Sequence, residues 1–179
     1  MTEKPTRTIE EKLARIEREY GMRLHPSYRD FLLASVEFCG GERRAWSMDE
    51  LVAWPGVSMP SAKAGRPNED TIEYWLHDLA ELWGIDSVLT EVDEEYRWSR
   101  ALLSKGYPIG VGYDGSLYIQ SSSGDVYHTY GDEWLEDEDH AELAKQSTEA
   151  FFKEWGHHHL ANDFRAFYRM LCERRGANG

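Results

Sequence analysis

The chain is poor in several features that define particular classes of protein. It has two cysteines, Cys39 and Cys172, and no C-x-x-C motif, which argues against a disulfide framework. No apolar run approaches the roughly 20 residues of a membrane-spanning helix, and the opening residues, MTEKPTRTIEEK, lack the apolar core of a secretory signal. Hydrophobic residues make up 41% of the chain, enough for a globular fold. We therefore expect a globular cytoplasmic protein.

Positive charge is also scarce, and the shortage is concentrated in two segments. The chain has 33 acidic and 20 basic residues, a formal net charge of −13. Residues 69–96 contain ten acids and residues 131–142 contain seven, and neither segment has a lysine or arginine. Such surfaces repel phosphates, which disfavours nucleic acid as a partner, and attract basic proteins. The simpler alternative is a solvated face that keeps the protein soluble.

Two helices are predicted at the N-terminus. Thr8 and Glu11 form a capping box that opens the first helix, and Gly21 is suited to end it. Pro26 fits the first position of the second helix, which Gly40–Gly41 ends. The predicted buried faces carry Ile9, Leu13, Ile16 and Tyr20 in the first helix, and Tyr28, Phe31, Leu32 and Ser35 in the second.

Shorter elements are predicted for the rest of the chain. In order they are a strand near residues 44–46, a helix opening at the capping box Ser47–Glu50, a loop over 55–68, a helix over 69–83, and two helical pieces hinged near Gly156. The helix over 69–83 rests on the spacing of Ile72, Trp75, Leu76, Leu79 and Leu82, and the last helix on that of Leu160, Phe164, Phe167 and Leu171. Residues 84–105 show no decisive pattern.

The order G-x-G-x-x-G occurs at Gly110, Gly112 and Gly115. A dinucleotide loop of this pattern must lead directly into a helix whose free N–H groups bind the pyrophosphate. Here SLYIQSSSGDVYHTY follows, which alternates as strands do, and Asp114–Gly115 predicts a two-residue type I′ hairpin turn. That turn would pair Gly112 with Leu117 and Gly110 with Ile119, leaving room for a helix over the glycines. The segment therefore predicts an antiparallel meander and no cofactor.

Candidate metal sites lack the arrangement that metal binding needs. The histidines at 157–159 are consecutive, so they diverge on a helix or strand and do not converge on one ion. We expect them at a helix boundary. A site combining them with His128 and the acids at 132–139 has none of the usual ligand spacings, and the run 136–139 lacks the glycine of a calcium loop. We expect no metal.

Candidate nucleophiles are equally isolated in the sequence. Residues 121–123 are serines in a turn without the G-x-S-x-G context. Cys39 is expected beside the apolar face of a helix, where buried thiols are inert, and Cys172 gives no reason to suspect reactivity. We therefore expect no catalytic residue.

Three stretches in a fixed order resemble one known family. They are LHPSYRDFLLASVEFCGG, YPIGVGYDGSLYIQSSSGDVYHTY, and the aromatic pair Phe151–Phe152 at the start of a helix. The set is similar to the SUKH superfamily, which includes yeast regulators of cell-wall assembly and many bacterial immunity proteins. The resemblance covers roughly residues 8–155. It departs from the family at LHP, where Leu-Pro is typical, in the acidic segment between Pro55 and Tyr96, and in an added helix near 160–174.

The resemblance implies a single α+β domain over residues 1–179, with an antiparallel meander packed against N-terminal and C-terminal helices. It implies protein binding and supplies no catalytic residues. Most bacterial members are antidotes that neutralise a toxin, and the alternative is a regulatory or scaffold module of the cell-wall-regulator type. The positions that match the family are read as fold determinants: Leu24, Pro26, Tyr28, Phe31, Leu32, Gly41, Pro108, Gly110, Gly124, Val126 and Tyr127.

Aromatic residues inside the acidic segments are the predicted contact surface. The chain has seven tryptophans, most of which are expected to fill the core, but Trp75 and Trp134 lie within acidic stretches and are the predicted anchors. The acids predicted to accompany them are Asp78, Glu81, Asp93, Glu94, Glu95, Asp132, Glu133, Glu136, Asp137, Glu138 and Asp139. The predicted partner is a basic toxin domain, for example a nuclease whose phosphate-binding groove these acids would occupy.

Overall fold

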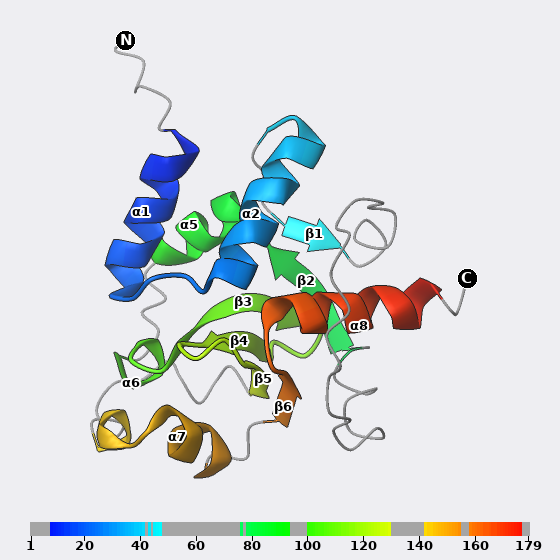
Figure 1. The fold of residues 1–179 in the computed structure, drawn as a ribbon. Coiled ribbons are helices and arrows are strands. Elements are labelled where there is room, and N and C mark those ends of the chain that lie inside the picture. The colour runs from blue at the N-terminus through cyan, green and yellow to red at the C-terminus, as the bar shows by residue number, and fades with distance from the viewer. Residues whose placement is uncertain are drawn as a thin grey trace.

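The computed structural model describes residues 8–41, 43, 45–47, 76, 78–93, 100–129, 142–154 and 158–176. The helices are α1 (Ile9–Tyr20), α2 (Pro26–Cys39), α5 (Ile85–Asp93), α6 (Arg100–Leu103), the 3₁₀ helix η2 (Leu143–Lys145), α7 (Thr148–Glu154) and α8 (Phe164–Gly176). The strands are β1 (Ala45–Ser47), β2 (Leu79–Trp83), β3 (Gly106–Gly112), β4 (Leu117–Ser121), β5 (Val126–Thr129) and β6 (His158–Ala161). Figure 1 shows their arrangement.

The strands of the described residues form one antiparallel sheet in the order β1-β2-β3-β4-β5-β6. Every strand therefore pairs with its neighbour in the sequence. One row of directly opposed residues crosses the whole sheet: Trp46, Leu82, Gly110, Tyr118, His128 and His158. The structure confirms the predicted α+β domain with an antiparallel meander between N-terminal and C-terminal helices.

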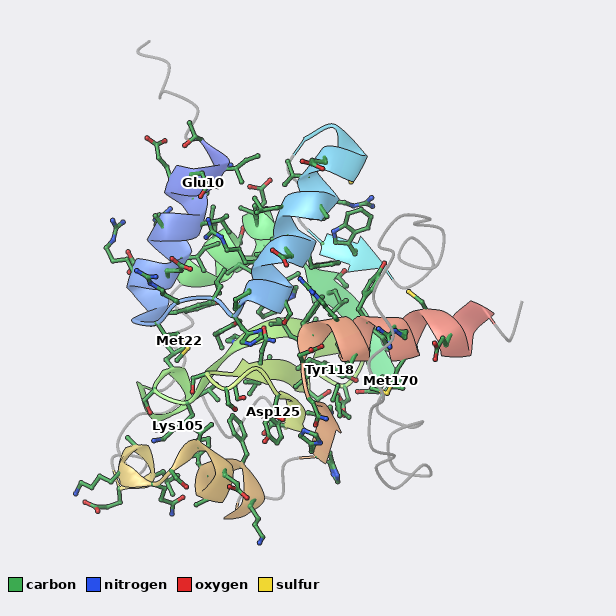
Figure 2. The ribbon with its side chains drawn as sticks, viewed as in Figure 1. Glu10, Met22, Lys105, Tyr118, Asp125 and Met170 are labelled. Carbon is green, nitrogen blue, oxygen red and sulfur yellow. The ribbon has the colours of Figure 1, made fainter. Side chains whose placement is uncertain are left out.

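Helices cover both faces of the sheet. The ring of Tyr118 lies 6.0 Å from that of Phe167, which places α8 on the face that carries Tyr118 (Figure 2). On the next strand, Tyr127 points to the opposite face and stacks on Phe152 of α7, with ring centroids 4.2 Å apart. The core is thus two apolar layers, one on each side of the sheet.

A buried lysine ties the segment before α7 to the sheet. The Nζ of Lys105 donates hydrogen bonds to the backbone carbonyls of Ala144, at 2.8 Å, and of Gln146. Figure 2 shows Lys105 beside the turn that leads into α7. A buried ammonium needs hydrogen-bond acceptors for its protons. The two carbonyls supply them, and the contact holds η2 against the start of β3.

The N-terminal helices form where the sequence predicts them. The Thr8 N–H donates to Oε2 of Glu11 at 2.8 Å, and the Glu11 N–H donates to Oγ1 of Thr8 at 3.3 Å, which completes the capping box. Gly21 and Gly40 end α1 and α2 in the left-handed conformation, and Pro26 occupies the first turn of α2. The predicted buried faces are confirmed, apart from Ile9, which is partly exposed.

The prediction of a helix over 69–83 is wrong at its C-terminal end, where residues 79–83 form the strand β2. A β-bulge lies between Leu79 and Glu81, so that Leu79 opposes Gly112 and Leu82 opposes Gly110. The bulge puts Leu79 and Leu82 on the same face although they are three residues apart. An i, i+3 pair is the spacing of a helix, and this bulge imitates it.

Of the two helical pieces predicted at the C-terminus, the first is confirmed as α7 and the second is correct only in part. Residues 158–161 form the edge strand β6, so Leu160 lies on a strand and not on a helix. The last helix begins at Phe164, and Phe164, Phe167 and Leu171 are buried as predicted. Strand β6 forms because its backbone pairs with β5, a partner that local spacing does not reveal.

The hairpin between β3 and β4 exists, but its turn type was predicted wrongly. Gly115 has φ +84°, and no non-glycine residue in the described part of the chain has positive φ, so Asp114 does not adopt the type I′ conformation. The Gly112 N–H donates to the Ser116 carbonyl at 2.9 Å, which closes a three-residue loop. The register therefore differs by one residue, and Gly110 opposes Tyr118 rather than Ile119.

Candidate partner-binding surface

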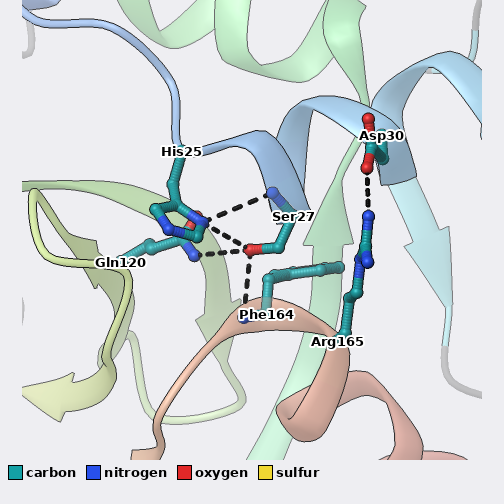
Figure 3. A network of polar contacts seen from close by, with 6 residues as sticks. All are labelled: His25, Ser27, Asp30, Gln120, Phe164 and Arg165. Carbon is teal, nitrogen blue, oxygen red and sulfur yellow. Dashed lines mark hydrogen bonds and ion pairs between the residues drawn. The ribbon is translucent and has the colours of Figure 1, made fainter. Parts of the chain in front are cut away.

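A fully connected polar network lies where α2, α8 and the sheet meet (Figure 3). The backbone N–H of Ser27 and its hydroxyl both point at Nδ1 of His25, so this nitrogen is the acceptor and the hydroxyl donates, at 2.8 Å. The Ser27 oxygen in turn accepts from Nε2 of Gln120 at 3.1 Å and from the backbone N–H of Phe164 at 3.3 Å. Tyr107 donates its hydroxyl to Oε1 of Gln120 at 2.8 Å.

This network is part of the fold and is closed to a substrate. Ser27 is 5% exposed and Gln120 is fully buried, and the Ser27 hydroxyl and both amide atoms of Gln120 already have hydrogen-bond partners inside the protein. His25, which stands in the position where the family resemblance departs from Leu-Pro, caps α2 and lies against Gly124. The exposed ion pair between Asp30 and Arg165 adds a second link between α2 and α8 (Figure 3).

A second polar cluster lies at the turn between β4 and β5. The Ser123 hydroxyl donates to Oδ2 of Asp125 at 2.8 Å, while Oδ1 of Asp125 lies 3.0 Å from Nε2 of His159. Nucleophilic catalysis needs the imidazole next to the hydroxyl. Here the carboxylate stands between them, so the cluster fastens the turn to the edge strand and does not prepare a nucleophile.

The histidine tract diverges on β6 and not at a helix boundary, so that expectation is corrected. His158 lies beside His128, with ring centroids 6.1 Å apart, whereas His159 turns to Asp125. Burial lowers the pKa of His128 to about 4, and the neighbouring His158 adds to the shift. Within the described ranges no three His, Cys, Asp or Glu side chains are grouped to hold a metal ion. Residue 157 lies outside those ranges.

The cysteines do not both occupy the places expected of them. Cys39 is exposed at the end of α2, which corrects the expectation of a thiol beside the apolar face. Its Sγ lies 4.0 Å from a guanidinium nitrogen of Arg43. Cys172 is half-buried, and burial raises the pKa of its thiol.

Two acidic side chains meet at the tip of the β3–β4 hairpin. Ser116 connects two carboxylates there: its hydroxyl donates to Oδ2 of Asp78 at 3.0 Å, and its backbone N–H donates to Oδ1 of Asp114 at 2.8 Å. Partial burial raises the pKa of Asp78, and the charge of Asp114 adds to the increase. For Asp114, burial acts in the same direction, but the hydrogen bonds from Ser116 outweigh it and lower the pKa.

The hairpin tip also presents an aromatic ring to solvent. Tyr113 is 73% exposed, and its backbone N–H donates to the carbonyl of Asp78 at 2.9 Å. Trp46 and Trp83, in contrast, are buried, and the other five tryptophans lie outside the described residues. An exposed tyrosine with polar residues around it is a common feature of protein-binding patches, whose anchors are often aromatic and whose rims are polar.

The predicted contact residues are placed in different parts of the fold. Asp78 lies at the hairpin tip, Glu81 is exposed on β2, and Asp93 ends α5, which follows β2 and packs beside α1. The other predicted residues lie outside the described ranges: Trp75, Glu94, Glu95, Asp132, Glu133, Trp134, Glu136, Asp137, Glu138 and Asp139.

Two residues of the tip, Tyr113 and Asp114, were missing from the predicted surface. The Asp-Gly pair had located the turn, and a turn between two strands places its residues on the surface. In the sequence, this segment served only to predict a turn and the pairing of two strands. Tyr113, the aromatic residue next to the Asp-Gly pair, was not considered as a contact residue. Asp78 reaches this turn because β2 pairs with β3. That pairing was not predicted, because residues 69–83 were expected to form a helix.

The described elements define a small α+β domain in which helices pack on one antiparallel sheet. The chain belongs to the SMI1 / KNR4 family (SUKH-1), whose family model matches residues 9–154. This match confirms the resemblance drawn from the sequence, and the family is in general a non-catalytic one that acts through protein interactions. Helix α8 lies beyond the matched residues and packs against α2.

Comparison with curated proteins and with solved structures finds no match to the chain. In the part of the chain that the structure describes, no helix combines the length and apolar character needed to cross a membrane.

Proposed function

We propose that this chain is a cytoplasmic immunity protein that binds a cognate bacterial toxin and neutralises it without catalysis. The observation that carries the proposal is the pair Asp78 and Asp114, whose carboxylates the fold holds together at the exposed tip of a hairpin. Membership in the family supports protein binding in general. The acidic tip supports a basic contact surface on the partner.

Two effects favour a basic partner. The net charge of −13 accelerates the approach of a cationic protein, with association rates raised roughly 10-fold to 1,000-fold at low salt. At close range, Asp78 and Asp114 repel each other, and a lysine or arginine placed between them replaces this repulsion with charge-assisted hydrogen bonds. The tryptophans and acids predicted at 75, 94–95 and 132–139 remain part of the proposed surface.

Coexpression tests the proposal. A neighbouring reading frame that encodes a secreted protein with a basic C-terminal domain supplies the candidate toxin, and we expect this domain to kill cells and the wild-type chain to rescue them. The double variant Asp78→Lys/Asp114→Lys should lose rescue, because it reverses the charge of the tip. The matched control is Glu19→Lys, an exposed acid on α1, which should rescue as well as the wild type.

The possible results distinguish the immunity role of the protein from the hairpin tip as its contact surface. Failure of the wild-type chain to rescue, with copurification of a host protein instead, would favour the regulatory or scaffold role. Rescue by the double variant, with its circular dichroism and melting temperature unchanged, would retain the immunity role and remove the hairpin tip from the contact surface.

A further inference from the structure

Hydrogen bonds hold the backbone of Tyr113, whereas its side chain extends into solvent. Its backbone N–H donates a hydrogen bond to the carbonyl of Asp78. Two further backbone hydrogen bonds close the loop around it: the Gly112 N–H donates to the Ser116 carbonyl at 2.9 Å, and the Gly115 N–H donates to the Gly112 carbonyl at 3.2 Å. With 73% exposure, Tyr113 is the large hydrophobic side chain that the described part of the chain leaves in solvent. A ring on a preorganised backbone loses little conformational entropy when a partner covers it.

The backbone beside Tyr113 is shaped to bring a carboxylate close. A Cβ placed on Gly112 would lie 2.3 Å from Oδ2 of Asp78 and 2.3 Å from Oγ of Ser116. Any side chain at position 112 would therefore displace Asp78 from the tip. The glycine permits a close approach that brings two like charges together, an arrangement that opposes stability in the free protein.

We infer that Tyr113 is the anchor of the contact surface and that the partner covers it with an arginine whose guanidinium faces Asp78 and Asp114; this inference rests on the proposed function. A guanidinium stacks flat on an aromatic ring and forms bidentate bonds with carboxylates, which a lysine ammonium does not. The ring supplies apolar contact and the acids supply the charge.

A short peptide serves as the probe of this inference. Acetyl-Gly-Arg-Gly-Arg-Gly-amide is titrated into the full-length ¹⁵N-labelled protein, with peptides carrying lysine or glutamate in place of arginine as comparisons. We expect amide shifts concentrated at residues 112–116 and at Asp78, with the arginine peptide binding more tightly than the lysine peptide. Tyr113→Phe should keep this binding, and Tyr113→Ser should weaken it about fivefold, the amount expected for an exposed cation–π contact.

Several results would overturn the inference. They are shifts centred elsewhere on the protein, equal binding of the lysine and arginine peptides, and an affinity that Tyr113→Ser leaves unchanged. Since Tyr113 is exposed, Tyr113→Ser should fold normally, and its melting temperature and spectrum verify this in the same samples.

The coexpression assay distinguishes the anchor from the immunity role. Rescue by the wild type that survives Tyr113→Ser overturns the anchor and leaves the immunity role standing. Arginine-selective binding at the tip by a chain that rescues no cells supports the anchor and counts against the immunity role. Rescue that is lost in Tyr113→Ser and retained in Tyr113→Phe supports both.

Discussion

The imidazole of His25 packs directly against the backbone of Gly124, so closely that a Cβ on Gly124 would lie 2.7 Å from Nε2 of His25. Gly124 belongs to the turn between β4 and β5, and its carbonyl accepts a hydrogen bond from Gln120 at 2.9 Å. The contact therefore joins the cap of α2 to the sheet, and it places a glycine where no side chain fits.

Gly124→Ala should destabilise the protein by about 3 kcal/mol, because φ is +106° and the new methyl group meets the imidazole. Urea unfolding followed by circular dichroism measures the change. Gly41→Ala is the matched control, since nothing lies within 4 Å of a Cβ there, and it should shift stability by no more than about 0.5 kcal/mol. Adding His25→Ala should recover only the steric part of the loss, and full recovery would contradict the backbone argument.

Ser27→Ala should cost about 1–3 kcal/mol, because it leaves one amide N–H of Gln120 and the backbone N–H of Phe164 without their buried acceptor, while the other amide N–H of Gln120 keeps the Gly124 carbonyl. The exposed Ser122 provides the control, and Ser122→Ala should be close to neutral. Chemical denaturation of the two variants side by side tests this prediction. Equal stabilities would mean that the network does not join α2, α8 and β4 as its geometry indicates.

Stability should depend on pH through His128. Burial and His158 lower its pKa to about 4, while the charge of Asp114 acts in the opposite direction and the ring of Tyr118 packs edge-on against it. The unfolded chain takes up this proton near pH 6.5 and the folded chain resists it. The stabilising contribution is therefore present above pH 6.5 and is lost as pH falls towards 4, by up to about 3 kcal/mol in total.

His128→Phe should flatten this dependence. The slope of unfolding free energy against pH between 4 and 6.5 should decrease by up to about 1.4 kcal/mol per pH unit, the value for one proton. The comparison uses slopes, so a general loss of stability in the variant does not affect it. Parallel curves for the variant and the wild type would show that His128 protonates as easily in the folded as in the unfolded protein.

Asp78→Asn should stabilise the free protein while weakening partner binding. The amide oxygen still accepts from Ser116, but the repulsion from Asp114 disappears. Because the pair is largely solvated, the gain should be only a few tenths of a kcal/mol. It should be present at pH 7 and vanish as pH falls through the raised pKa of Asp78, where the wild-type group protonates. Thermal melts of the variant and the wild type at pH 7 and at a pH below the pKa of Asp78 measure this gain in stability. A variant that is less stable than the wild type at pH 7 would contradict the prediction.

Local interactions were sufficient to predict much of this fold. The ends of α1 and α2 depend on groups that lie within a few residues of one another: the Thr8–Glu11 capping box, Pro26 at the start of α2, and the glycines that end both helices. Such short-range interactions can be predicted from the sequence. The meander was also predictable, because alternating strands on either side of a Gly-containing turn have few other ways to pair.

Local sequence patterns were therefore enough to specify the two N-terminal helices, the meander of β3, β4 and β5, and the acidic character of the chain. Tertiary structure alone decided that residues 79–83 are a bulged strand, that residues 158–161 are an edge strand, and that Asp78 joins Asp114 beside Tyr113. The physical reason is that a strand is stabilised by backbone partners about 30 residues away, and a bulge shifts which side chains share a face. No pattern within either strand contains that information.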